Sequence, residues 1–395
     1  MTAPVETGLE VALREPPQRL RDARAFGLLS NQASVTRGFG HATDALHERF
    51  PETLRALFGP QHGLWSTEQD NMIETAHATY RGLPVHSLYS ETRRPTDAML
   101  DGLDLLVVDL QDVGTRVYTY AWTLTNCMRA CAERGVAVMV LDRPNPLGGV
   151  VAEGARLDPA YESFVGGAQV PMRHGLTLGE LARHCDQELG IGCELHVTEM
   201  RGWRRDMLWA DTGLAWVPPS PNLPRHEGAL VYPGQVLLEG TNLSEGRGTT
   251  TPFEQFGAPW LDPRALQDAL GDVEGAALRP VAFEPTFQKF AGQPCRGLFA
   301  HVTEPGSLRS YALTLRLLRA IRRHLGDALR WNDPPYEYEE TLLPIDILAG
   351  GDAARRWVDG TDGGAEDDEA TLAAIAGEPE GWWAAAAPSL LYPAP

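Results

Sequence analysis

Acidic, amide, imidazole, guanidinium and phenol side chains that could bind or protonate a polar substrate gather in a few short segments of the sequence. The segments are GPQHG and the stretch after it, the block DLQDVGTRVYTY, the motif DRPNP and the glycine-rich block EGTNLSEGRG. Carboxylates beside amides and arginines are suited to acid–base chemistry on a polyhydroxylated substrate. The candidate residues are Gln61, His62, Glu74, Asp109, Asp112, Arg116, Tyr118, Tyr120, Asp142, Arg143, Asn145, Asn242, Glu245 and Arg247.

Several of these residues also have a purely structural interpretation. An Asp that ends a buried strand, such as Asp109 or Asp142, often caps a helix or forms a turn. Asp112 and Arg116 lie four residues apart and could form an ion pair on a helix. His62 could satisfy only the backbone of its own loop. Each position is therefore weighed as a site residue against one of these simpler roles.

The block around Glu245 and Arg247 is the hardest to explain as structure alone. Glycines flank both charged residues, so the backbone can take conformations that suit a ligand, and Arg247 can fork onto a carboxylate. Other motifs are absent: no dinucleotide-binding G-x-G-x-x-G follows the first expected strand, and no phosphate loop, H-E-x-x-H or G-x-S-x-G is present. We therefore expect no cofactor and no metal.

The candidate segments follow apolar runs that have the length of buried strands. LLVVDL at residues 105–110 and VAVMVL at residues 136–141 predict strands covered on both faces, with further strands at 26–31, 56–58, 84–88 and 194–200. Helices are predicted over residues 117–134 and from Leu178, where Thr177 and Glu180 form a capping box. This alternation predicts a Rossmann-like, doubly wound α/β fold with a mostly parallel sheet, in which ligands bind at the carboxyl ends of strands.

The sequence changes character from about residue 209. Residues 218–224 and 232–257 are rich in Pro, Gly, Thr and Asn and predict ordered loops. A strand at 281–287 and a helix with a buried stripe from Leu308 to Leu325 follow, and the Gly/acid tract at 359–369 predicts a solvated loop. We predict a catalytic domain over residues 1–239 and a smaller auxiliary α+β domain over residues 240–395.

Composition excludes several classes of protein. The chain has 34 basic and 53 acidic residues and a formal net charge of −19, which argues against binding nucleic acid or anionic membranes. No run approaches the roughly 18 apolar residues of a membrane span. Residues 1–10 lack the basic and apolar regions of a secretory signal, so we expect a cytoplasmic protein, or an extracytoplasmic one if a leader has been trimmed. The five scattered cysteines predict no disulfide framework.

Six sequence blocks together resemble the exo-β-N-acetylmuramidase family. They are GPQHG, LVVDLQDVGTRVYTY, VLDRPNP, HGLTLGELA, PSPNLP and EGTNLSEGRGTTTPFEQFGAP, and the resemblance runs from about residue 28 to residue 392. It implies a Rossmann-like domain and an auxiliary domain with the active site in the cleft between them. It also implies that terminal β-linked N-acetylmuramic acid is removed from peptidoglycan fragments without a nicotinamide cofactor. The expected partner is thus a peptidoglycan-derived saccharide.

The sequence departs from the family at one important position. The glutamate proposed as catalytic in the family lies in a Pro-Glu-His-Gly segment, and here that position is Gln61. An amide can bind a sugar, but it cannot give or take a proton in acid–base catalysis. We therefore expect Glu74, downstream on the same loop, to be the acid, with Glu91 and Glu245 as alternatives.

The other candidates receive roles in the same hypothesis of glycoside hydrolysis. Asp109 or Asp112 would activate water or orient the substrate's own 2-acetamido group. Arg116 or Arg247 would clamp the lactyl carboxylate of muramic acid, and His62 would act beside the acid and bind hydroxyls. The remaining residues expected to bind the sugar are Gln61, Tyr118, Tyr120, Asp142, Arg143, Asn145, Asn222, Asn242 and Glu245.

Two other functions remain open at this point. The protein could bind cell-wall sugars without catalysis, with Gln61 marking the lost chemistry. It could also be a metal-assisted hydrolase built on Asp109, Asp112, Asp142 and His62. Ligand affinity without turnover would indicate the first alternative, and sensitivity to chelators would indicate the second.

Overall fold

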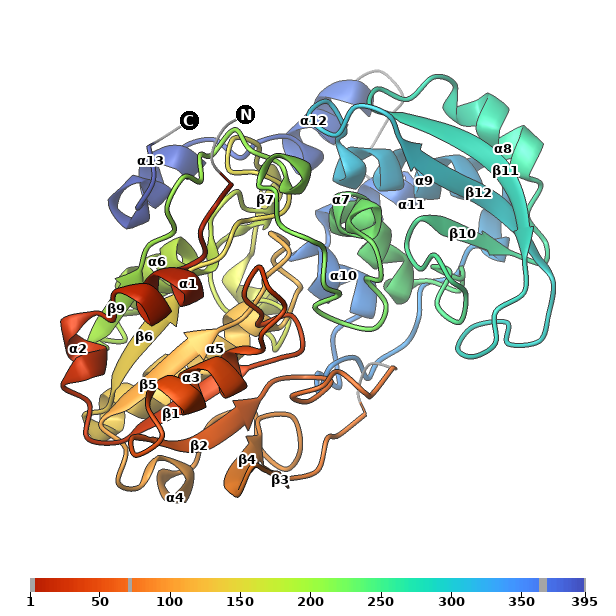
Figure 1. Cartoon of the computed structure of the whole chain (residues 1–395). Coiled ribbons are helices and arrows are strands. Elements are labelled where there is room, and N and C mark those ends of the chain that lie inside the picture. The colour runs from red at the N-terminus through yellow and green to blue at the C-terminus, as the bar shows by residue number, and fades with distance from the viewer. Residues whose placement is uncertain (1–3, 70–72, 362–367, 394–395) are drawn as a thin grey trace.

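The structure is a computed structural model that describes residues 4–69, 73–361 and 368–393. Figure 1 shows a larger part built on a wide sheet and a smaller part that contains a second sheet. Residues 70–72 of the segment that leads to Glu74, and residues 362–367 of the acidic tract, lie outside the described ranges. Within the described ranges, no helix has both the length and the apolar character needed to span a membrane.

A mostly parallel sheet of seven strands forms the larger part, as the sequence predicts. Its order is β3-β4-β2-β1-β5-β6-β9, and every neighbouring pair is parallel except β3 with β4. The strands are β1 (Phe26–Ser30), β2 (Leu54–Gly59), β3 (Ala78–Tyr80), β4 (Leu83–Ser87), β5 (Leu105–Asp109), β6 (Ala137–Leu141) and β9 (Leu195–Thr198). The six predicted strands of this part are confirmed.

Side chains alternate across the sheet, so each strand contributes to two separate cores. In β5, Leu105 and Val107 belong to one buried cluster, and Leu106 and Val108 belong to another. The first cluster includes residues of α1 (Gly8–Arg14), α2 (Gln18–Arg21) and α3 (Ala42–Arg49), and the second includes α5 (Tyr120–Arg134) and α6 (Leu178–Leu189). Helices on both faces explain why the strands read as continuous apolar runs.

Helix ends in this part follow local chemistry. The predicted capping box of α6 is present: the Thr177 side chain accepts from the Glu180 N–H, and the Glu180 side chain accepts from the Thr177 N–H. Helix α5 begins at Tyr120 and not at residue 117, because the chain first turns at Gly114 and bonds the Arg116 N–H to a carbonyl of strand β8 (Pro171–Arg173). This turn leaves residues 117–119 free to line a pocket.

The smaller part contains an antiparallel sheet of order β10-β12-β11, made of β10 (Gln255–Ala258), β11 (Ala276–Phe283) and β12 (Cys295–Val302). Helices α7 (His226–Gln235) and α8 (Pro263–Leu270) contact this sheet, and helix α9 (Ser310–Leu325) packs against both helices. The α+β prediction is confirmed, although β11 begins before the predicted strand at residue 281.

The expectation of irregular loops over residues 232–257 is wrong at both ends. Helix α7 reaches Gln235, the 3₁₀ helix η3 (Val236–Gly240) continues it, and β10 begins at Gln255. Pro233 lies inside α7, and the residues from 228 to 235 are all buried, so the helix shows no amphipathic periodicity. The boundary predicted at residues 239/240 stays a prediction.

The end of the chain returns to the larger part. In Figure 1, α13 (Trp382–Ala386) and the C-terminus lie beside the N-terminal elements. The Trp382 indole donates to the His174 carbonyl, and the Tyr392 hydroxyl donates to Asp142 at 2.8 Å. The remaining elements are α4 (Asp97–Leu100), β7 (Glu153–Arg156), η1 (Pro159–Tyr161), β8 (Pro171–Arg173), η2 (Trp209–Asp211), α8 (Pro263–Leu270), η4 (Gly326–Ala328), α10 (Pro344–Ala349), α11 (Ala353–Asp359), α12 (Asp368–Ala376) and η5 (Ala387–Ser389).

Candidate active site

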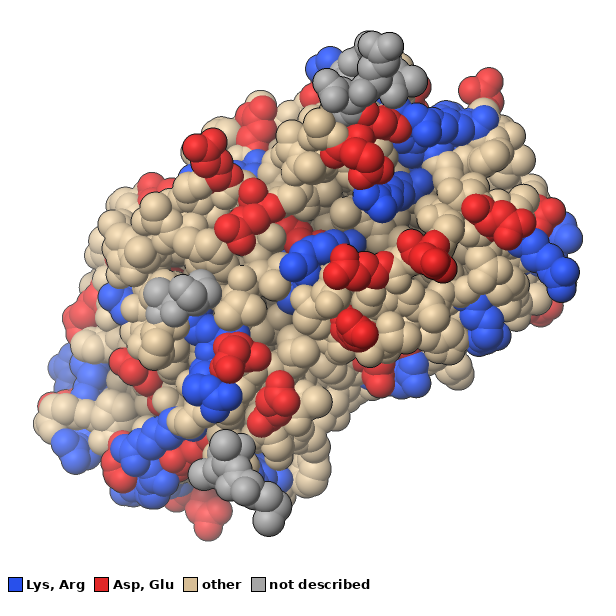
Figure 2. All heavy atoms as spheres, turned by 90° about the horizontal axis from the view of Figure 1, so that it is seen from above, with Lys and Arg blue, Asp and Glu red and all other residues tan. Residues whose placement is uncertain are grey.

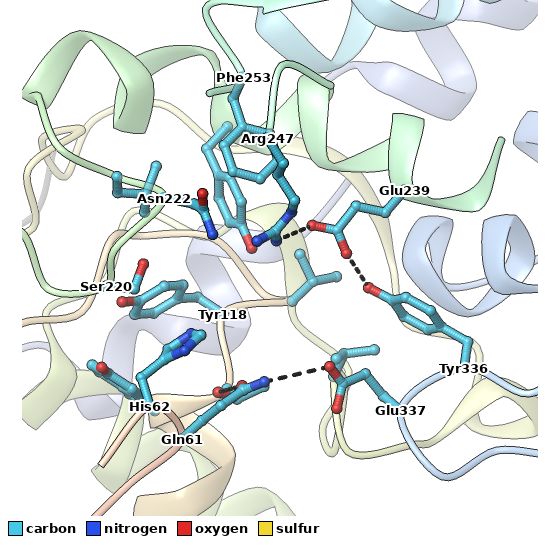
Figure 3. Close-up of a pocket in the computed structure, with 16 residues that line it drawn as sticks. Gln61, His62, Tyr118, Ser220, Asn222, Glu239, Arg247, Phe253, Tyr336 and Glu337 are labelled. Carbon is cyan, nitrogen blue, oxygen red and sulfur yellow. Dashed lines mark hydrogen bonds and ion pairs between the residues drawn. The ribbon is translucent and has the colours of Figure 1, made fainter. Parts of the chain in front are cut away.

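A pocket lies where loops from the carboxyl ends of β2 and β5 meet η3 and a turn near residue 337 (Figure 3). Its lining therefore comes from segments far apart in the sequence and from both parts of the molecule. The lining residues are Gln61, His62, Val117, Tyr118, Thr119, Tyr120, Val165, Ser220, Asn222, Leu223, Tyr232, Glu239, Arg247, Phe253, Tyr336 and Glu337.

Glu337 is a buried carboxyl group that faces this pocket. The Tyr89 hydroxyl donates to its Oε2 at 2.8 Å, and the Gln61 amide nitrogen lies 3.5 Å from its Oε1. Burial raises the pKa of Glu337 to about 7, with the charge of Glu239 acting in the same direction and the Tyr89 hydrogen bond opposing it. Glu337 can therefore hold a proton near neutral pH and give it up to a substrate.

Glu239 is a second carboxylate of the pocket, and both of its oxygens are held. Nη2 of Arg247 donates to Oε1 at 2.6 Å, and the Tyr336 hydroxyl donates to Oε2 at 2.7 Å (Figure 3). The Glu239 side chain is only 7% exposed. A carboxylate fixed in this way can stabilise positive charge without first having to reorient.

Arg247 joins Glu239 to another buried carboxylate, Glu245. Its Nε lies 3.3 Å from Glu245, which also lies 3.1 Å from Nζ of Lys289. Burial raises the pKa of Glu245, but the charges of Lys289 and Arg247 outweigh it and lower that pKa overall. Gly246 fits between them at a φ of 79°, where a Cβ would lie 2.6 Å from the Gln255 carbonyl oxygen, so the glycine is required.

Lys289 is the single lysine of the sequence, and it is bound to the same segment. Its ammonium donates to the carbonyls of Leu238 at 2.8 Å and Leu243 at 3.1 Å, and lies 3.4 Å from that of Glu239. With Glu245 as a further acceptor, the ammonium sits among four oxygens. A compact cation with rotatable donors suits such a cage better than a planar guanidinium, so Lys289 fixes the backbone that carries Glu239.

The GPQHG loop, residues 59–63, contributes Gln61 and His62 to the other side of the pocket. The Gln61 amide oxygen accepts from the Thr119 hydroxyl at 2.7 Å, which turns its nitrogen toward Glu337. Nδ1 of His62 lies 2.7 Å from the Glu68 carbonyl, and burial lowers the pKa of His62 to about 4. His62 is therefore neutral near pH 7, and it can bind a hydroxyl group but carries no proton to transfer as an acid.

Six of the residues chosen from the sequence line the pocket, and the others do not. The six are Gln61, His62, Tyr118, Tyr120, Asn222 and Arg247. The Tyr120 hydroxyl donates to the Pro219 carbonyl at 2.7 Å, and the Asn222 amide donates to the Gln69 carbonyl at 2.5 Å. Their roles toward a sugar stay predictions, although their positions agree with such roles.

Asp109 and Arg143 form a closed pair outside the pocket lining. Nε and Nη2 of Arg143 donate to the two oxygens of Asp109 at 2.5 Å and 2.8 Å, and Nη2 also reaches the Val35 carbonyl. Asp109 is fully buried. Because the partner already occupies both carboxylate oxygens, we revise the expectation that Asp109 activates water and that Arg143 binds sugar.

Three further polar residues near the carboxyl ends of β5 and β6 hold loops in place. Asp142 accepts from the Thr177 hydroxyl at 2.7 Å and so fastens the start of α6. Asp112 accepts from the Gly114 N–H at 2.6 Å, and the Asn145 amide donates to a backbone carbonyl of residue 176 at 2.9 Å. The helix-capping interpretation thus describes the contacts of Asp142, whereas Asp112 closes a turn in place of the ion pair with Arg116 that was weighed for it.

Arg116 and Asn242 likewise bind backbone outside the pocket lining. The Arg116 guanidinium is buried and donates to the carbonyls of Ala155, Val170 and Leu348. Asn242 donates to the Ala328 carbonyl at 2.9 Å. These contacts leave Arg247 as the candidate clamp for a substrate carboxylate. Glu245 does not line the pocket, but it contacts the lining residue Arg247.

Glu74, the acid expected from the sequence, lies outside the pocket lining. Its side chain is 59% exposed and lies 3.7 Å from Nη2 of Arg93. Glu91 is also exposed and pairs with His77 at 3.1 Å. Because neither carboxyl group lines the pocket, we revise the choice of acid in favour of Glu337.

The sequence analysis missed Glu337, Tyr336 and the role of Glu239. Glu337 follows two prolines in the short run PPYEYEE, and nothing in its periodicity marks it. Glu239 opens the glycine-rich block, in which Asn242, Glu245 and Arg247 are the more conspicuous candidates. A usable signal for Glu337 was a cluster of two tyrosines and three glutamates in an otherwise polar connection.

The comparisons with known proteins agree along nearly the whole chain. Residues 26–227 match the family model described as "Exo-beta-N-acetylmuramidase NamZ, N-terminal", and residues 230–392 match its C-terminal counterpart. The chain belongs to the exo-β-N-acetylmuramidase family. The resemblance inferred from the six sequence blocks is thereby confirmed.

Family relatives and solved structures cover most of this chain. It is 42% identical over 320 residues to "Peptidoglycan beta-N-acetylmuramidase NamZ" of Bacillus subtilis (strain 168). The aligned region covers 80% of this chain and 77% of that protein. A crystal structure of a DUF1343 family protein from Bacteroides fragilis NCTC 9343 has a TM-score of 0.82 at 30% identity and covers 98% of this chain and 99% of its own. A second one from the same organism has a TM-score of 0.72 at 27% identity over 100% of both chains.

Proposed function

We propose that this exo-β-N-acetylmuramidase-family glycosidase releases terminal β-linked N-acetylmuramic acid in the pocket around Glu239, Arg247 and Glu337, with Glu337 as the general acid. The observation that carries the proposal is a buried glutamic acid with a pKa of about 7 beside a second, fixed carboxylate. Two carboxyl groups with different environments are the equipment of most glycoside hydrolases.

In the proposed step, Glu337 donates its proton to the glycosidic oxygen. The bond between that oxygen and C1 of muramic acid breaks, and the leaving sugar departs with the proton. Tyr89 donates to Oε2 at 2.8 Å, whereas the Gln61 amide nitrogen lies 3.5 Å from Oε1, so the more weakly held Oε1 carries the proton in this step. The carboxylate left on Glu337 then accepts a proton from the water that completes hydrolysis.

Glu239 acts on the positive charge that develops at C1. It is held by Arg247 and Tyr336, so its charge is in place before the reaction. Whether it faces C1 itself or the nitrogen of the 2-acetamido group, the same negative charge lowers the energy of the transition state. Glu239 takes the role that the sequence analysis gave to Asp109 or Asp112.

Arg247 is the proposed recognition residue for the lactyl carboxylate of muramic acid. Its Nη2 is bound to Glu239 and its Nε faces Glu245, which leaves Nη1 without a hydrogen bond among the described residues. Burial lowers the pKa of Arg247, but the charges of Glu239 and Glu245 outweigh it and raise that pKa overall, so the guanidinium stays charged. A carboxylate on the substrate distinguishes muramic acid from glucosamine, which has none.

The alternatives considered from the sequence receive little support. No group of three His, Cys, Asp or Glu side chains gathers in metal-binding geometry within residues 4–69, 73–361 and 368–393. The non-catalytic alternative was based on Gln61, which cannot donate a proton. Because Glu337 can donate one, Gln61 no longer argues against catalysis. On the face shown in Figure 2, acidic and basic side chains are interspersed, with no basic patch suited to nucleic acid. A cytoplasmic site of action stays a prediction.

The test is the release of N-acetylmuramic acid from a chromogenic β-muramide by Glu337→Gln and Glu74→Gln. General acid–base catalysis contributes about 10²- to 10⁴-fold, so we expect Glu337→Gln to lose about that much in kcat. Glu74→Gln should stay close to the wild type. Equal rates for Glu337→Gln and the wild type, with folding confirmed, would remove Glu337 from the mechanism.

A further inference from the structure

The turn that carries Glu337 has an unusual backbone. Tyr336 and Glu339 exchange both backbone hydrogen bonds at 2.9 Å, which closes a two-residue turn. Its central residues, Glu337 and Tyr338, have φ values of 45° and 70°. Two consecutive positive φ values are the pattern of a type I′ turn, where Asn and Gly are favoured. Such conformations are strained, persist only where the surrounding structure holds them, and are frequent at active sites.

The ring of Tyr338 packs outward from the turn against Arg93 and Tyr89. It is 50% exposed, and a glycine at its position would relieve the strained φ. Glu337, the other strained residue, places its carboxyl group in the pocket. The same turn therefore places the carboxyl group of Glu337 in the pocket and the ring of Tyr338 on the next residue of the chain.

Tyr338 belongs to a cluster of rings at the edge of the pocket, which we call the aromatic rim and define as Tyr89, Arg93, Phe164 and Tyr338. The Arg93 guanidinium lies 3.7 Å from the centroid of the Tyr338 ring and 4.9 Å from that of Tyr89. The Tyr89 ring lies 5.8 Å from Phe164 and 6.0 Å from Tyr338. The rim is thus built from three distant segments and held in place by a cation.

Two residues of the aromatic rim connect it to the pocket and to the proposed acid. Phe164 directly precedes Val165, a lining residue of the pocket, and the Tyr89 hydroxyl donates to the proposed acid Glu337. The acid must reach the glycosidic oxygen, so the sugar on the far side of that oxygen lies next to the acid and beyond the pocket. The exposed ring of Tyr338 is the side chain adjacent to Glu337 in the chain.

We infer that the aromatic rim is a binding subsite for the sugar on the leaving-group side of the scissile bond, a neutral N-acetylhexosamine whose apolar face stacks on Tyr338. The inference rests on the proposed function of Glu337. A flat, partly exposed ring that is fixed by Arg93 offers packing surface at little entropic cost. The uncharged partner also fits, because the rim presents one guanidinium that is already committed to two rings and lies beside Glu74.

The test compares two substrates with different leaving groups. The disaccharide N-acetylmuramyl-β-1,4-N-acetylglucosamine occupies the subsite, and β-N-acetylmuramyl fluoride does not reach it. The readout is the kcat/KM for the disaccharide divided by the kcat/KM for the fluoride. Tyr338→Gly should lower this ratio by about tenfold, the equivalent of 1.4 kcal/mol of stacking. The Tm of the same variant should rise, because the glycine relieves the backbone strain. Tyr338→Phe keeps the ring and should keep the ratio.

A matched control is available in the chain. Phe39 is also exposed and has a φ of 63°, but it lies outside the pocket lining. Phe39→Gly should change Tm in the same direction and leave the ratio unchanged. An unchanged ratio in Tyr338→Gly, or equal losses on both substrates, would overturn the subsite.

A binding measurement separates this inference from the proposed mechanism. In the Glu337→Gln background, calorimetric titration with the disaccharide should show affinity weakened about tenfold by Tyr338→Gly and retained by Tyr338→Phe. If the wild type turns over neither substrate but this difference in affinity is present, the proposed chemistry fails and the subsite stands. If affinity is equal in all three proteins, the subsite fails.

Discussion

Two buried arginine–carboxylate clusters in this molecule contain the same kinds of charged group and differ in how those groups are paired. At the carboxyl end of β5, Arg143 grips both oxygens of Asp109 in a two-pronged pair and also binds the backbone. In the pocket, Arg247 touches Glu239 through one nitrogen, and Tyr336 holds the other oxygen. The first cluster is saturated by the protein, whereas the second keeps donor capacity at a surface that a ligand can reach.

The difference shows that buried charge alone does not mark an active site. Desolvation is costly for both clusters. In the first, complementary hydrogen bonds offset that cost and fix the loops after two strands. In the second, Arg247 and Lys289 together offset the burial of Glu239 and Glu245, and burial keeps the pKa of Glu337 at about 7. Charged and titratable groups that the protein pairs only in part keep hydrogen-bonding and proton-transfer capacity for a substrate.

The largest expected effect comes from breaking the saturated cluster. Arg143→Met leaves Asp109 as an unpaired buried charge and should cost about 3–5 kcal/mol in the free energy of unfolding. The double variant Asp109→Leu/Arg143→Met should recover much of that loss and retain activity. Denaturant unfolding together with muramidase assays measures both quantities. A folded double variant that has no activity would show that this cluster contributes to the site.

The pocket cluster should respond in the opposite way. Glu239→Gln/Arg247→Met removes charges of both signs together, so we expect a folded protein whose kcat/KM is at least about 100-fold lower, as for the loss of a preorganised electrostatic group. Circular dichroism and the same assay measure these outcomes. Activity near that of the wild type would place the chemistry elsewhere.

A smaller effect is expected from the single lysine. Hydrogen bonds to charged groups contribute about 1.5–3 kcal/mol, so Lys289→Met should lower kcat by about 10- to 100-fold as the segment carrying Glu239 loosens. Lys289→Arg should restore the charge but only part of the rate, because a planar fork does not match the four oxygens. Full rescue by arginine would show that charge, and not the cage geometry, is what matters.

Much of the fold could be predicted from the sequence, and less of the site could. Continuous apolar runs identified the strands, because strands buried on both faces need them. The polar residues after those strands were found, but the sequence does not show whether Asp109 meets Arg143 or a substrate. Glu337 lies 276 residues from Gln61, and the two meet only through the packing of the smaller part against the larger. Contacts of that range leave no periodic signal.

The pH dependence gives a test that uses the wild type. The acid must be protonated, so kcat/KM should fall about tenfold per pH unit above the Glu337 pKa of about 7. This group's folded pKa is raised above the ordinary 4.5, so its contribution to stability is complete below pH 4.5 and is lost as the pH rises through 7. The Tm of Glu337→Gln should therefore exceed that of the wild type at pH 8 more than at pH 5. A rate that is flat from pH 6 to pH 9 would exclude this acid.

The smallest expected effect is on the alkaline limb of the pH profile, the fall of kcat/KM above pH 7. Gln61→Glu, which restores the residue type of the family motif, should shift this limb. The new carboxyl group would face Oε1 of Glu337 at the position where the amide nitrogen now lies 3.5 Å away. Two carboxyl groups so close share one proton, and their upper apparent pKa rises. We expect the limb to move up by about one pH unit, whereas Gln61→Leu, which removes only the amide donor, should move it less. A downward shift in Gln61→Glu would mean that the new glutamate itself has become the acid and that Glu337 serves it.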